Sequence, residues 1–522
     1  MDMVSRRDVL RAGALGVAGA IAIGSGVESE SAASAASAAS AASSPPGAPT
    51  VSPGALRQLR KKLTGTLLLP GDKGYDTSSA PANGRYRGIR PLAVAVCANE
   101  ADVVTCVKWV RQNGVPPVGR GGGHSYAGYS TTPGLLINLS RLNRVAIDRN
   151  SGTVASGGAA LNNDFYQATK DGPLFLPGGT CLGVGVGGLA LGGGIGYQTH
   201  WAGLTSDHMQ SSRIVTASGE VLNLDAKHNS DLFWACRGGA GGSFGINTAF
   251  SFKLVEVPSE VTWYRYDWQG ADAAIAVLNA FNNMVYKAPA ALNAVAAATA
   301  VPLAGKSPSQ AIEVFSRGQY IGPADELHDL VQPLLAAAGT PVKSVFQKMS
   351  FWDVVAMISS TEPPSHGFGD ISRYASVPIP ESAVTAIVDL LADCPSRSDD
   401  DNGSIWSLGW VGGSVVDSVK RTDTAYVHRG MSTLLRPTTV WSDDAAPSVG
   451  QDLNAWTNSV IAAIEPYTPD ESYQNFPNRM ISDWQKQYYA ENFARLVQVK
   501  TKYDPDNLFH NQQSIPTATS AT

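Results

Sequence analysis

Alternating hydrophobic and small residues predict short strands in the first half of the chain, with helices between them. Residues 91–98 alternate as a strand does, and residues 100–112 then show apolar positions at helical spacing up to Asn113-Gly114. Further strands are predicted at 115–119, 135–138, 145–148 and 153–156, a helix near 162–170, and a hairpin at 213–224. Hairpins outnumber βαβ units in this pattern, so the first half is predicted to be mixed α+β.

The pattern changes at Pro258, where glycine clusters become rare and alanine-rich helical stretches alternate with strands. The helical stretches are 271–281, 327–338 and 381–392, and the strand-like runs are 261–268, 311–315, 405–411 and 439–441. This alternation predicts a second domain in which helices cover one face of a sheet.

Composition and charge narrow the possible partners. The chain has 522 residues, which at roughly 150 residues per domain predicts two to four domains, and its hydrophobic content of 43% excludes a disordered protein. Lys and Arg number 39 against 44 Asp and Glu, a net charge of -5, and no basic stripe is present. We therefore expect neither nucleic acid nor an anionic membrane as a partner. The five cysteines include no C-x-x-C pair, so a zinc site has no support and no metal is expected.

The N-terminus has the pattern of an export signal. Ser5-Arg6-Arg7 opens a twin-arginine pattern, an apolar run follows at 12–23, and residues 31–43 repeat Ser-Ala-Ala. The apolar run is too short and too rich in alanine and glycine to anchor the chain in a membrane. Because twin-arginine export carries folded proteins, we expect a secreted protein that receives a cofactor before export. Residues 1–45 are therefore treated as signal and linker.

Three glycine-rich loops mark the first domain. Arg120-Gly121-Gly122-Gly123-His124-Ser125 follows a predicted strand, and consecutive glycines let backbone N–H groups crowd around an anion such as a phosphate. A second cluster runs through residues 177–194 and a third through residues 238–245. Together they predict one extended, phosphate-bearing cofactor.

Two motifs inside these loops offer other functions. Gly183, Gly185 and Gly188 form a G-x-G-x-x-G pattern, but a Pro-Gly-Gly turn precedes it and three more glycines follow, which does not fit an NAD-binding fold. The 241–245 segment reads G-x-S-x-G around Ser243, as in the nucleophile elbow of hydrolases, but no strand directly precedes it. A serine hydrolase that uses Ser243 is therefore a remote alternative.

Four elements, in order along the chain, resemble the berberine-bridge-enzyme-like branch of the FAD-linked oxidases with the vanillyl-alcohol-oxidase, or PCMH-type, fold. They are residues 119–125, 178–185, 231–246 and 488–509, and the resemblance covers essentially the whole chain after the linker. It implies an α+β protein: an FAD-binding domain of two α+β subdomains, then a substrate domain with an antiparallel sheet covered by helices, then a C-terminal segment that returns to the FAD domain. The corresponding limits are 46–257, 258–464 and 465–522, after the signal and linker at 1–45.

The resemblance also implies a cofactor and roles for individual residues. It implies bicovalent FAD, with His124 bound to the flavin 8α-methyl group and Cys181 to the 6-position. Tyr473, in a Tyr-x-Asn-aromatic element, would take the proton of a substrate hydroxyl while hydride passes to the flavin, which requires a nearby group that lowers the pKa of this tyrosine. The further cofactor-binding residues are Arg120, Gly121, Gly122, Gly123, Ser125, Gly179, Val184, Gly185, Gly188, Gly192, Gly245, Ile246 and Asn475, and the candidate substrate-binding residues are Trp410 and Tyr426.

The expected reaction follows from the same resemblance. Val184 stands at the position where valine admits oxygen and a bulkier leucine blocks it, which implies an oxidase that uses O2 and releases H2O2. The expected substrate is a hydroxyl-bearing carbon of a sugar, an oligosaccharide or a polycyclic natural product. An oxidative cyclase that forms a new ring bond is an alternative enzyme. A binding protein without flavin is disfavoured because both tether residues and Tyr473 are present.

Overall fold

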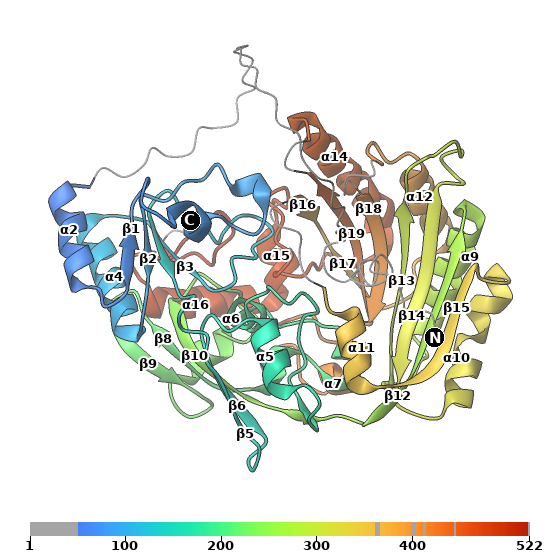
Figure 1. The fold of residues 1–522 in the computed structure, drawn as a ribbon, viewed down its shortest axis with the longest axis horizontal. Coiled ribbons are helices and arrows are strands. Elements are labelled where there is room, and N and C mark those ends of the chain that lie inside the picture. The colour runs from blue at the N-terminus through green and yellow to red at the C-terminus, as the bar shows by residue number, and fades with distance from the viewer. Residues whose placement is uncertain (1–50, 361–365, 398–402, 411–413, 443–444, 520–522) are drawn as a thin grey trace.

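The computed structural model describes residues 51–519, apart from residues 361–365, 398–402, 411–413 and 443–444, and for residues 403–410 and 414 it describes the backbone alone. Within these residues two sheets occupy the first half of the chain and a larger sheet occupies the second half (Figure 1). This arrangement is the mixed α+β architecture that the sequence predicts. The short elements include α3 (Tyr75–Ser79), η2 (Gly84–Tyr86), α7 (Thr199–Ala202), η3 (Thr205–His208), α13 (Ser414–Asp417) and a separate two-stranded antiparallel sheet of β7 (Leu174–Phe175) and β11 (Val255–Glu256).

The first sheet has four strands in the order β1-β2-β4-β3, and β4 runs parallel to both β2 and β3. Helix α4 connects β2 to β3 and begins where the side chain of Asn99 accepts a hydrogen bond from the backbone N–H of Asp102. It ends at Gly114, whose φ of 63° lies in the left-handed region that favours glycine. The elements are α2 (Pro53–Lys62), β1 (Thr66–Leu68), β2 (Ala93–Val96), α4 (Glu100–Asn113), β3 (Pro117–Arg120) and β4 (Leu135–Asn138).

The second sheet has five antiparallel strands in the order β5-β6-β10-β8-β9. Its strands bury alternate residues, and Phe250 and Phe252 of β10 belong to the large hydrophobic core that extends into the second half of the chain. The elements are β5 (Val145–Asp148), β6 (Thr153–Gly157), α5 (Asn162–Thr169), α6 (Val186–Leu191), β8 (Met209–Val215), β9 (Val221–Leu224), α8 (Ser230–Ala235) and β10 (Ile246–Lys253).

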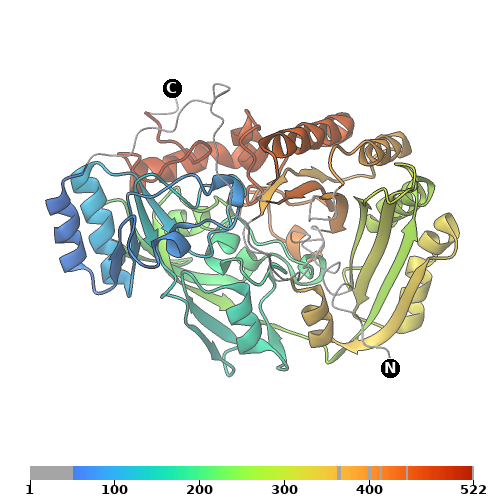
Figure 2. The ribbon, with the colours of Figure 1, turned by 45° about the horizontal axis from the view of Figure 1, so that its top comes forward.

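The third sheet has eight strands in the order β15-β12-β14-β13-β18-β19-β16, with β17 paired to β19, and its neighbouring strands run antiparallel. Figures 1 and 2 show helices gathered on one of its faces. The elements are β12 (Glu260–Gln269), α9 (Ala271–Val285), β13 (Leu292–Ala300), β14 (Ile312–Tyr320), α10 (Ala324–Ala338), β15 (Lys343–Ser350), α11 (Phe351–Ile358), β16 (Gly367–Asp370), β17 (Arg373–Ala375), α12 (Glu381–Ala392), β18 (Gly403–Trp410), β19 (Thr433–Trp441) and α14 (Pro447–Ile464).

The two faces of the third sheet belong to different cores, as strand β13 shows. Ala294, Ala296 and Ala298 point into the core shared with α9 and α12, whereas Val295 and Ala297 point into a separate cluster with α11. Because neighbouring side chains of a strand point to opposite faces, the alanine positions let the helices lie close to the sheet.

The C-terminal segment crosses back to the first half of the molecule. After η4 (Glu465–Tyr467) it forms α15 (Trp484–Tyr489), η5 (Ala490–Asn492) and α16 (Phe493–Tyr503), and α16 lies beside the first two sheets (Figure 1). The fully buried ammonium of Lys500 on α16 donates to the backbone oxygens of Ser243 and Phe509 and to Asp504 Oδ2, each at 2.6 Å. Helix α16 therefore holds the third glycine loop in place through the hydrogen bond from Lys500 to Ser243.

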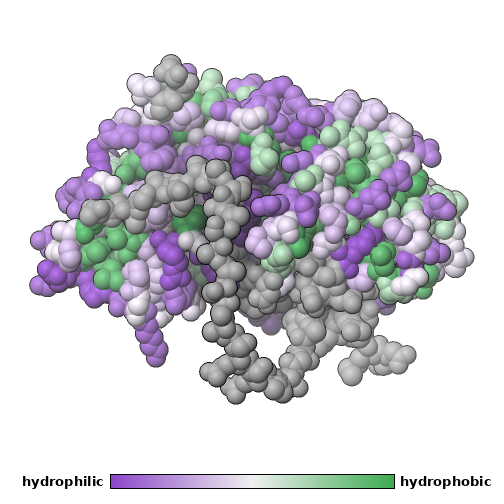
Figure 3. Space-filling model, turned by 90° about the horizontal axis from the view of Figure 1, so that it is seen from above, coloured by the Kyte–Doolittle hydropathy of each residue, from purple (hydrophilic) through white to green (hydrophobic). Residues whose placement is uncertain are grey.

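The visible upper face mixes hydrophilic and hydrophobic residues, with small hydrophobic patches among polar ones (Figure 3). Large hydrophobic side chains that are exposed in the described residues are scattered along the chain: Leu303, Val342, Val377, Tyr467 and Met480. In the same part of the chain, every helix is too short or too polar to cross a membrane.

Replacing Lys500 with methionine is expected to lower the free energy of unfolding by about 3–5 kcal/mol, because it leaves the buried carboxylate of Asp504 without its cation. Lys502→Met is the matched control, since Lys502 pairs with Asp231 at the surface and its loss should cost no more than about 1 kcal/mol. Denaturant unfolding of the two variants measures the difference. Equal losses would contradict this description of Lys500.

Candidate active site

A cavity of about 310 Å³ lies where the three glycine loops meet strand β19 and the C-terminal segment. Its walls include residues 117–126 of the first loop, parts of residues 179–196 of the second, and parts of residues 240–247 of the third. Leu434 and Arg436 reach it from β19, and residues 473–477 reach it from the C-terminal segment. The three loops predicted to hold a cofactor therefore share one cavity.

The first two loops touch backbone to backbone. A Cβ atom added at Gly122 would lie 2.4 Å from the backbone nitrogen of Gly185, and one added at Gly185 would lie 2.5 Å from the backbone nitrogen of Gly122. A Cβ at Gly187 would lie 2.6 Å from the backbone oxygen of Gly158. Only glycine permits these approaches, so the spacing of the loops is set by the absence of side chains.

His124 and Cys181, the predicted covalent tethers, both line this cavity. The segment around Cys181 is held from two sides: Asn162 Nδ2 donates to the backbone oxygen of Cys181 at 2.8 Å, and Ser360 Oγ donates to its sulfur at 3.5 Å. Ser360 follows α11, in the half of the chain that forms the third sheet. That half therefore also helps to fix the loop that carries Cys181. The His124 ring stacks near Phe368 of β16, with 6.3 Å between ring centroids.

Most of the other predicted cofactor-binding residues also line the cavity. They are Arg120, Gly121, Gly122, Gly123, Ser125, Gly179, Val184, Gly185, Gly188, Gly245, Ile246 and Asn475. Gly192 lies behind the wall instead, because a Cβ there would overlap the amide of Asn475. Its predicted role as a direct cofactor contact is therefore replaced by that of a packing position.

The guanidinium of Arg120 is occupied by backbone oxygens. It donates hydrogen bonds of 2.8–3.1 Å to the backbone oxygens of Ser78, Ser79, Ala80 and Ser130. Burial lowers its pKa to about 10. The side chain therefore fixes the first glycine loop against the α3 segment, and the predicted cofactor contact is left to the backbone of this residue.

The hydroxyl oxygen of Tyr473 is already surrounded by donors. It accepts hydrogen bonds from the backbone N–H groups of Gly194 at 2.9 Å and Ile195 at 3.2 Å, and from Asn475 Nδ2 at 2.9 Å. These donors favour an ionised phenol, but burial outweighs them and the pKa of Tyr473 is raised. Tyr473 is 1% exposed and lines the cavity. Its three donors hold the loop at Gly194 and are the kind of group that the predicted proton transfer requires, and the catalytic role of Tyr473 stays a prediction.

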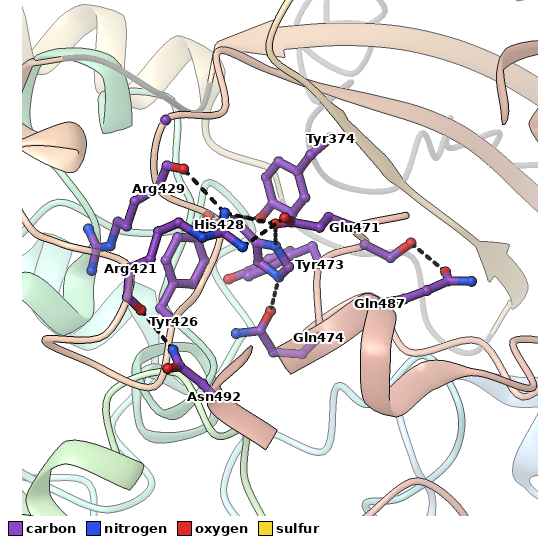
Figure 4. Close-up of polar contacts among 12 residues, drawn as sticks. Tyr374, Arg421, Tyr426, His428, Arg429, Glu471, Tyr473, Gln474, Gln487 and Asn492 are labelled. Carbon is purple, nitrogen blue, oxygen red and sulfur yellow. Dashed lines mark hydrogen bonds and ion pairs between the residues drawn. The ribbon is translucent and has the colours of Figure 1, made fainter. Parts of the chain in front are cut away.

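A buried polar network holds the segment that carries Tyr473 (Figure 4). The two ring nitrogens of His428 face Glu471 Oε2 at 2.7 Å and Gln474 Oε1 at 3.2 Å, and Arg421 pairs with the other oxygen of Glu471. Gln474 Nε2 donates to the backbone oxygen of Gly238 at 2.7 Å. Burial lowers the pKa of His428, although Glu471 opposes this shift. The network joins the C-terminal segment to the third glycine loop.

Tyr426, predicted to bind substrate, lies away from the cavity wall. Its ring is fully buried beside that of Tyr374 (Figure 4), and the two hydroxyl groups pair at 2.8 Å. Tyr426 is not among the described residues that line the cavity. A Cβ at Gly238 would overlap its backbone nitrogen, so it packs behind the third loop. The side chain of Trp410, the other predicted substrate contact, lies outside the described residues, and its backbone ends β18.

One charged group at the cavity wall was missed by the sequence analysis. Arg436 of β19 pairs with Asp370 of β16, its Nε donating to Asp370 Oδ2 at 2.6 Å, and its Nη2 donates to the hydroxyl oxygen of Tyr126 at 3.0 Å. Its guanidinium carbon lies 4.0 Å from the centre of the Phe476 ring. The only sequence signal was a charged residue inside a hydrophobic strand, and Tyr126 follows His124 by two positions in the first loop.

Two family models match the chain: an FAD binding domain over residues 91–225, and a berberine and berberine-like segment over residues 472–516. The uncharacterized FAD-linked oxidoreductase YgaK of Bacillus subtilis (strain 168) is 31% identical over 470 residues, which cover 88% of this chain and 98% of that protein. The chain belongs to the berberine-bridge-enzyme-like FAD-linked oxidoreductases. This confirms the family, the FAD cofactor and the enzyme class that the sequence motifs predict.

Solved structures of berberine-bridge-enzyme-like proteins share the fold of this oxidoreductase. The wild-type BBE-like 1 protein of Physcomitrella patens is 26% identical with a TM-score of 0.77, covering 88% of this chain and 99% of the other. A glucooligosaccharide oxidase from Acremonium strictum, whose FAD is described as 6-S-cysteinyl, 8α-N1-histidyl, is 25% identical with a TM-score of 0.77 and the same coverage. The PCMH-type fold is therefore confirmed.

The residues of the cavity fit FAD. Glycines 121–123, 185, 187 and 188 leave backbone N–H groups and no side chains where a long dinucleotide must pass, and a Cβ at Gly188 would meet open space. Among the described residues no cluster of three or more His, Cys, Asp or Glu side chains is placed to hold a metal ion.

The hydrolase alternative does not fit this flavoenzyme. In a nucleophile elbow a strand precedes the serine and a helix follows it. Here α8 precedes Ser243 and β10 follows it, which is the reverse order. Ser243 is 2% exposed and its Oγ accepts a hydrogen bond from the backbone of Ile515. The serine therefore helps to fix the C-terminal segment.

Replacing Gly122 with alanine is expected to separate the first two loops and lower the fraction of purified protein that carries flavin, at a cost of about 1–3 kcal/mol for the overlap. Gly88→Ala is the control, because a Cβ there meets nothing within 4 Å and Gly88 is remote from the cavity wall. The flavin-to-protein absorbance ratio measures the effect. Full flavin content in Gly122→Ala would contradict the contact.

Proposed function

We propose that this flavoenzyme binds FAD through two covalent bonds, one from His124 and one from Cys181. The proposal rests on one observation. These two side chains lie 57 positions apart in the sequence, yet both line the cavity between the glycine loops. The glucooligosaccharide oxidase with 6-S-cysteinyl, 8α-N1-histidyl FAD supports it by similarity.

We further propose that the enzyme oxidises a hydroxyl-bearing carbon of a sugar, an oligosaccharide or a polycyclic natural product to a carbonyl or lactone, with O2 as the acceptor and H2O2 as the product. When bound, FAD supplies the hydride-accepting chemistry of this reaction. The fold neighbour that acts on glucooligosaccharides favours carbohydrate substrates. The twin-arginine pattern at Ser5-Arg6-Arg7, outside the described residues, supports export of the folded flavoprotein.

Acid precipitation of the purified protein tests the covalent linkage. The wild type, His124→Ala and Cys181→Ala are each expected to keep the flavin in the pellet, because one bond is enough to retain it, whereas the double variant releases it to the supernatant. Cys236→Ala is a matched control, since Cys236 is buried in the same half of the chain and away from the cavity wall. Flavin released from the wild type would contradict the proposal.

Val184→Leu is expected to slow the reaction of reduced enzyme with O2 by about tenfold or more, which corresponds to about 1.4 kcal/mol of barrier. Val184 is half-exposed on the cavity wall, so a larger side chain there narrows the approach of oxygen. Stopped-flow reoxidation of the reduced enzyme measures this step. The rate of flavin reduction by substrate serves as the internal control and should remain near that of the wild type.

A further inference from the structure

The segment that carries Tyr473 has no regular secondary structure of its own. Between η4 and α15, residues 468–483 form turns and irregular backbone, so contacts from other parts of the chain must fix their position. The predicted role of Tyr473 as proton acceptor needs its hydroxyl oxygen within hydrogen-bond reach of the substrate hydroxyl. A displacement of about 1 Å can slow such a step by about 100-fold. The contacts that hold this segment are therefore part of the geometry of the reaction.

His428 contacts the segment on both sides of Tyr473 (Figure 4). Its Nδ1 lies 2.7 Å from Glu471 Oε2, and its Nε2 lies 3.2 Å from Gln474 Oε1. Glu471 precedes Tyr473 by two residues, and Gln474 follows it by one. Because the two nitrogens belong to one rigid ring, His428 helps to set the separation of residues 471 and 474, and with it the course of the backbone between them.

The orientation of the Gln474 amide decides which ring nitrogen donates to it. Gln474 Nε2 donates to the backbone oxygen of Gly238 at 2.7 Å, so its Oε1 faces His428 Nε2 and accepts from it. The contact between Nδ1 and Glu471 Oε2 then needs a further proton, shared by these two side chains. Burial opposes a charge on the ring and lowers its pKa, whereas the pair that holds this proton has no net charge.

The ring of His428 is itself held by two tyrosines. It stacks on Tyr374 with 4.3 Å between ring centroids and 21° between the planes, and Tyr426 packs edge-on against it at 5.2 Å. The hydroxyl groups of Tyr374 and Tyr426 pair at 2.8 Å. The ring of Tyr426 also packs edge-on against that of Tyr473, at 6.4 Å. Tyr426 therefore supports both His428 and Tyr473 from outside the described cavity wall.

Arg429, the next residue along the chain, fixes the backbone at His428. Its guanidinium pairs with Asp207 of η3 at 2.6 and 2.8 Å, and both side chains are buried. The backbone N–H of Thr205, also in η3, donates to the backbone oxygen of Gly194 at 3.0 Å. Since the N–H of Gly194 donates to the Tyr473 hydroxyl oxygen, His428 and this donor are attached to the same support.

We propose that His428 is a positioning residue for the proton transfer, and that it holds the hydroxyl oxygen of Tyr473 in place by bonding Glu471 and Gln474. This inference rests on the proposed oxidase function, in which Tyr473 is the predicted proton acceptor. It adds to that function a buried residue outside the described cavity wall.

Replacing His428 with phenylalanine removes both nitrogens and keeps a ring against Tyr374. Anaerobic rapid mixing of the holoenzyme with cellobiose, xylobiose or diacetylchitobiose measures the rate of flavin reduction. In the folded, flavin-containing variant this rate is expected to fall by roughly 30-fold or more, while the substrate concentration at half-maximal rate stays within about threefold of the wild type. A reduction rate within about threefold of the wild type would overturn the proposal.

His200→Phe is the matched control. His200 is also buried and its Nδ1 faces the backbone oxygen of Leu292, but it lies on α7 and not among the described residues of the cavity wall. Its replacement is expected to cost stability without slowing flavin reduction by more than about threefold. Equal losses of rate in the two variants would point to a general effect of removing a buried histidine and would contradict the proposal.

Two conservative variants test the ring nitrogens one at a time. The side-chain N–H of asparagine approximates the position of Nδ1, and that of glutamine approximates the position of Nε2. His428→Asn is therefore expected to keep the contact with Glu471, His428→Gln the contact with Gln474, and each to reduce its flavin faster than His428→Phe. If both variants are folded, contain full flavin and are as slow as His428→Phe, the positioning role of the nitrogens is contradicted.

Amide hydrogen exchange gives a readout that needs no substrate. The N–H groups of Gly194 and Ile195 donate to the Tyr473 oxygen, so a displacement of this oxygen removes their protection. In His428→Phe they are expected to exchange about tenfold faster or more, whereas β4 at 135–138 keeps its wild-type rate. Unchanged exchange at 194–195, or an equal acceleration in β4, would overturn the proposal.

The two readouts separate this proposal from the proposed function. If exchange changes at 194–195 and not in β4, and none of the three sugars reduces the wild-type flavin, the carbohydrate substrate fails and the positioning of Tyr473 by His428 stands. If the sugars reduce the wild type and His428→Phe at similar rates, the oxidation of sugars stands and the positioning role of His428 fails.

Discussion

The backbone contact between Gly122 and Gly185 is the constraint on which the site depends. A side chain at either position would enter the other loop, so the two loops approach this closely only because both residues are glycine. His124 follows Gly122 by two residues, and Cys181 precedes Gly185 by four. The same contact therefore places His124 and Cys181, the two proposed flavin tethers, on one cavity wall. Because each tether is only a few residues from the contacting glycine of its loop, the two side chains have little freedom to move apart.

The third sheet and the C-terminal segment supply further residues of the cavity wall. Ser360, at the end of α11, hydrogen-bonds the sulfur of Cys181, and Arg436 of β19 brings a buried positive charge to the hydroxyl of Tyr126. The segment at 471–475 reaches the cavity between them, held by His428 and by the donors around Tyr473. Residues from three distant parts of the chain therefore meet at one cavity.

Local signals in the sequence predicted the elements whose residues agree with their structure. The helix expected at 100–112 is α4, the strand at 135–138 is β4, and the helix at 381–392 is α12. Strand β13 was missed because its alanines favour a helix, and its strand form is imposed by pairing with β14 and β18. The glycine loops were recognised from the sequence itself, and the family resemblance supplied the predicted tether residues.

Side chains whose role depends on long-range contacts were less predictable. The three donors to the Tyr473 oxygen come from residues 194, 195 and 475. A sequence motif predicts neither the distances from these donors to the oxygen nor the energetic cost of burying the phenol. Tyr426 was expected at the substrate because aromatic residues occupy such sites, yet it packs behind a glycine loop. Arg436 was missed because its partners Asp370 and Tyr126 are 66 and 310 positions away.

The central claim, that this family member is an oxidase with a tightly held FAD, is tested most directly by titrating the purified holoenzyme with one reducing disaccharide under anaerobic conditions and then admitting air. The account predicts that one equivalent of sugar bleaches one equivalent of flavin, and that air restores the colour and yields one equivalent of H2O2. A flavin that bleaches but is not restored by air would contradict the oxidase assignment. A flavin that no hydroxyl-bearing substrate bleaches would contradict the account as a whole.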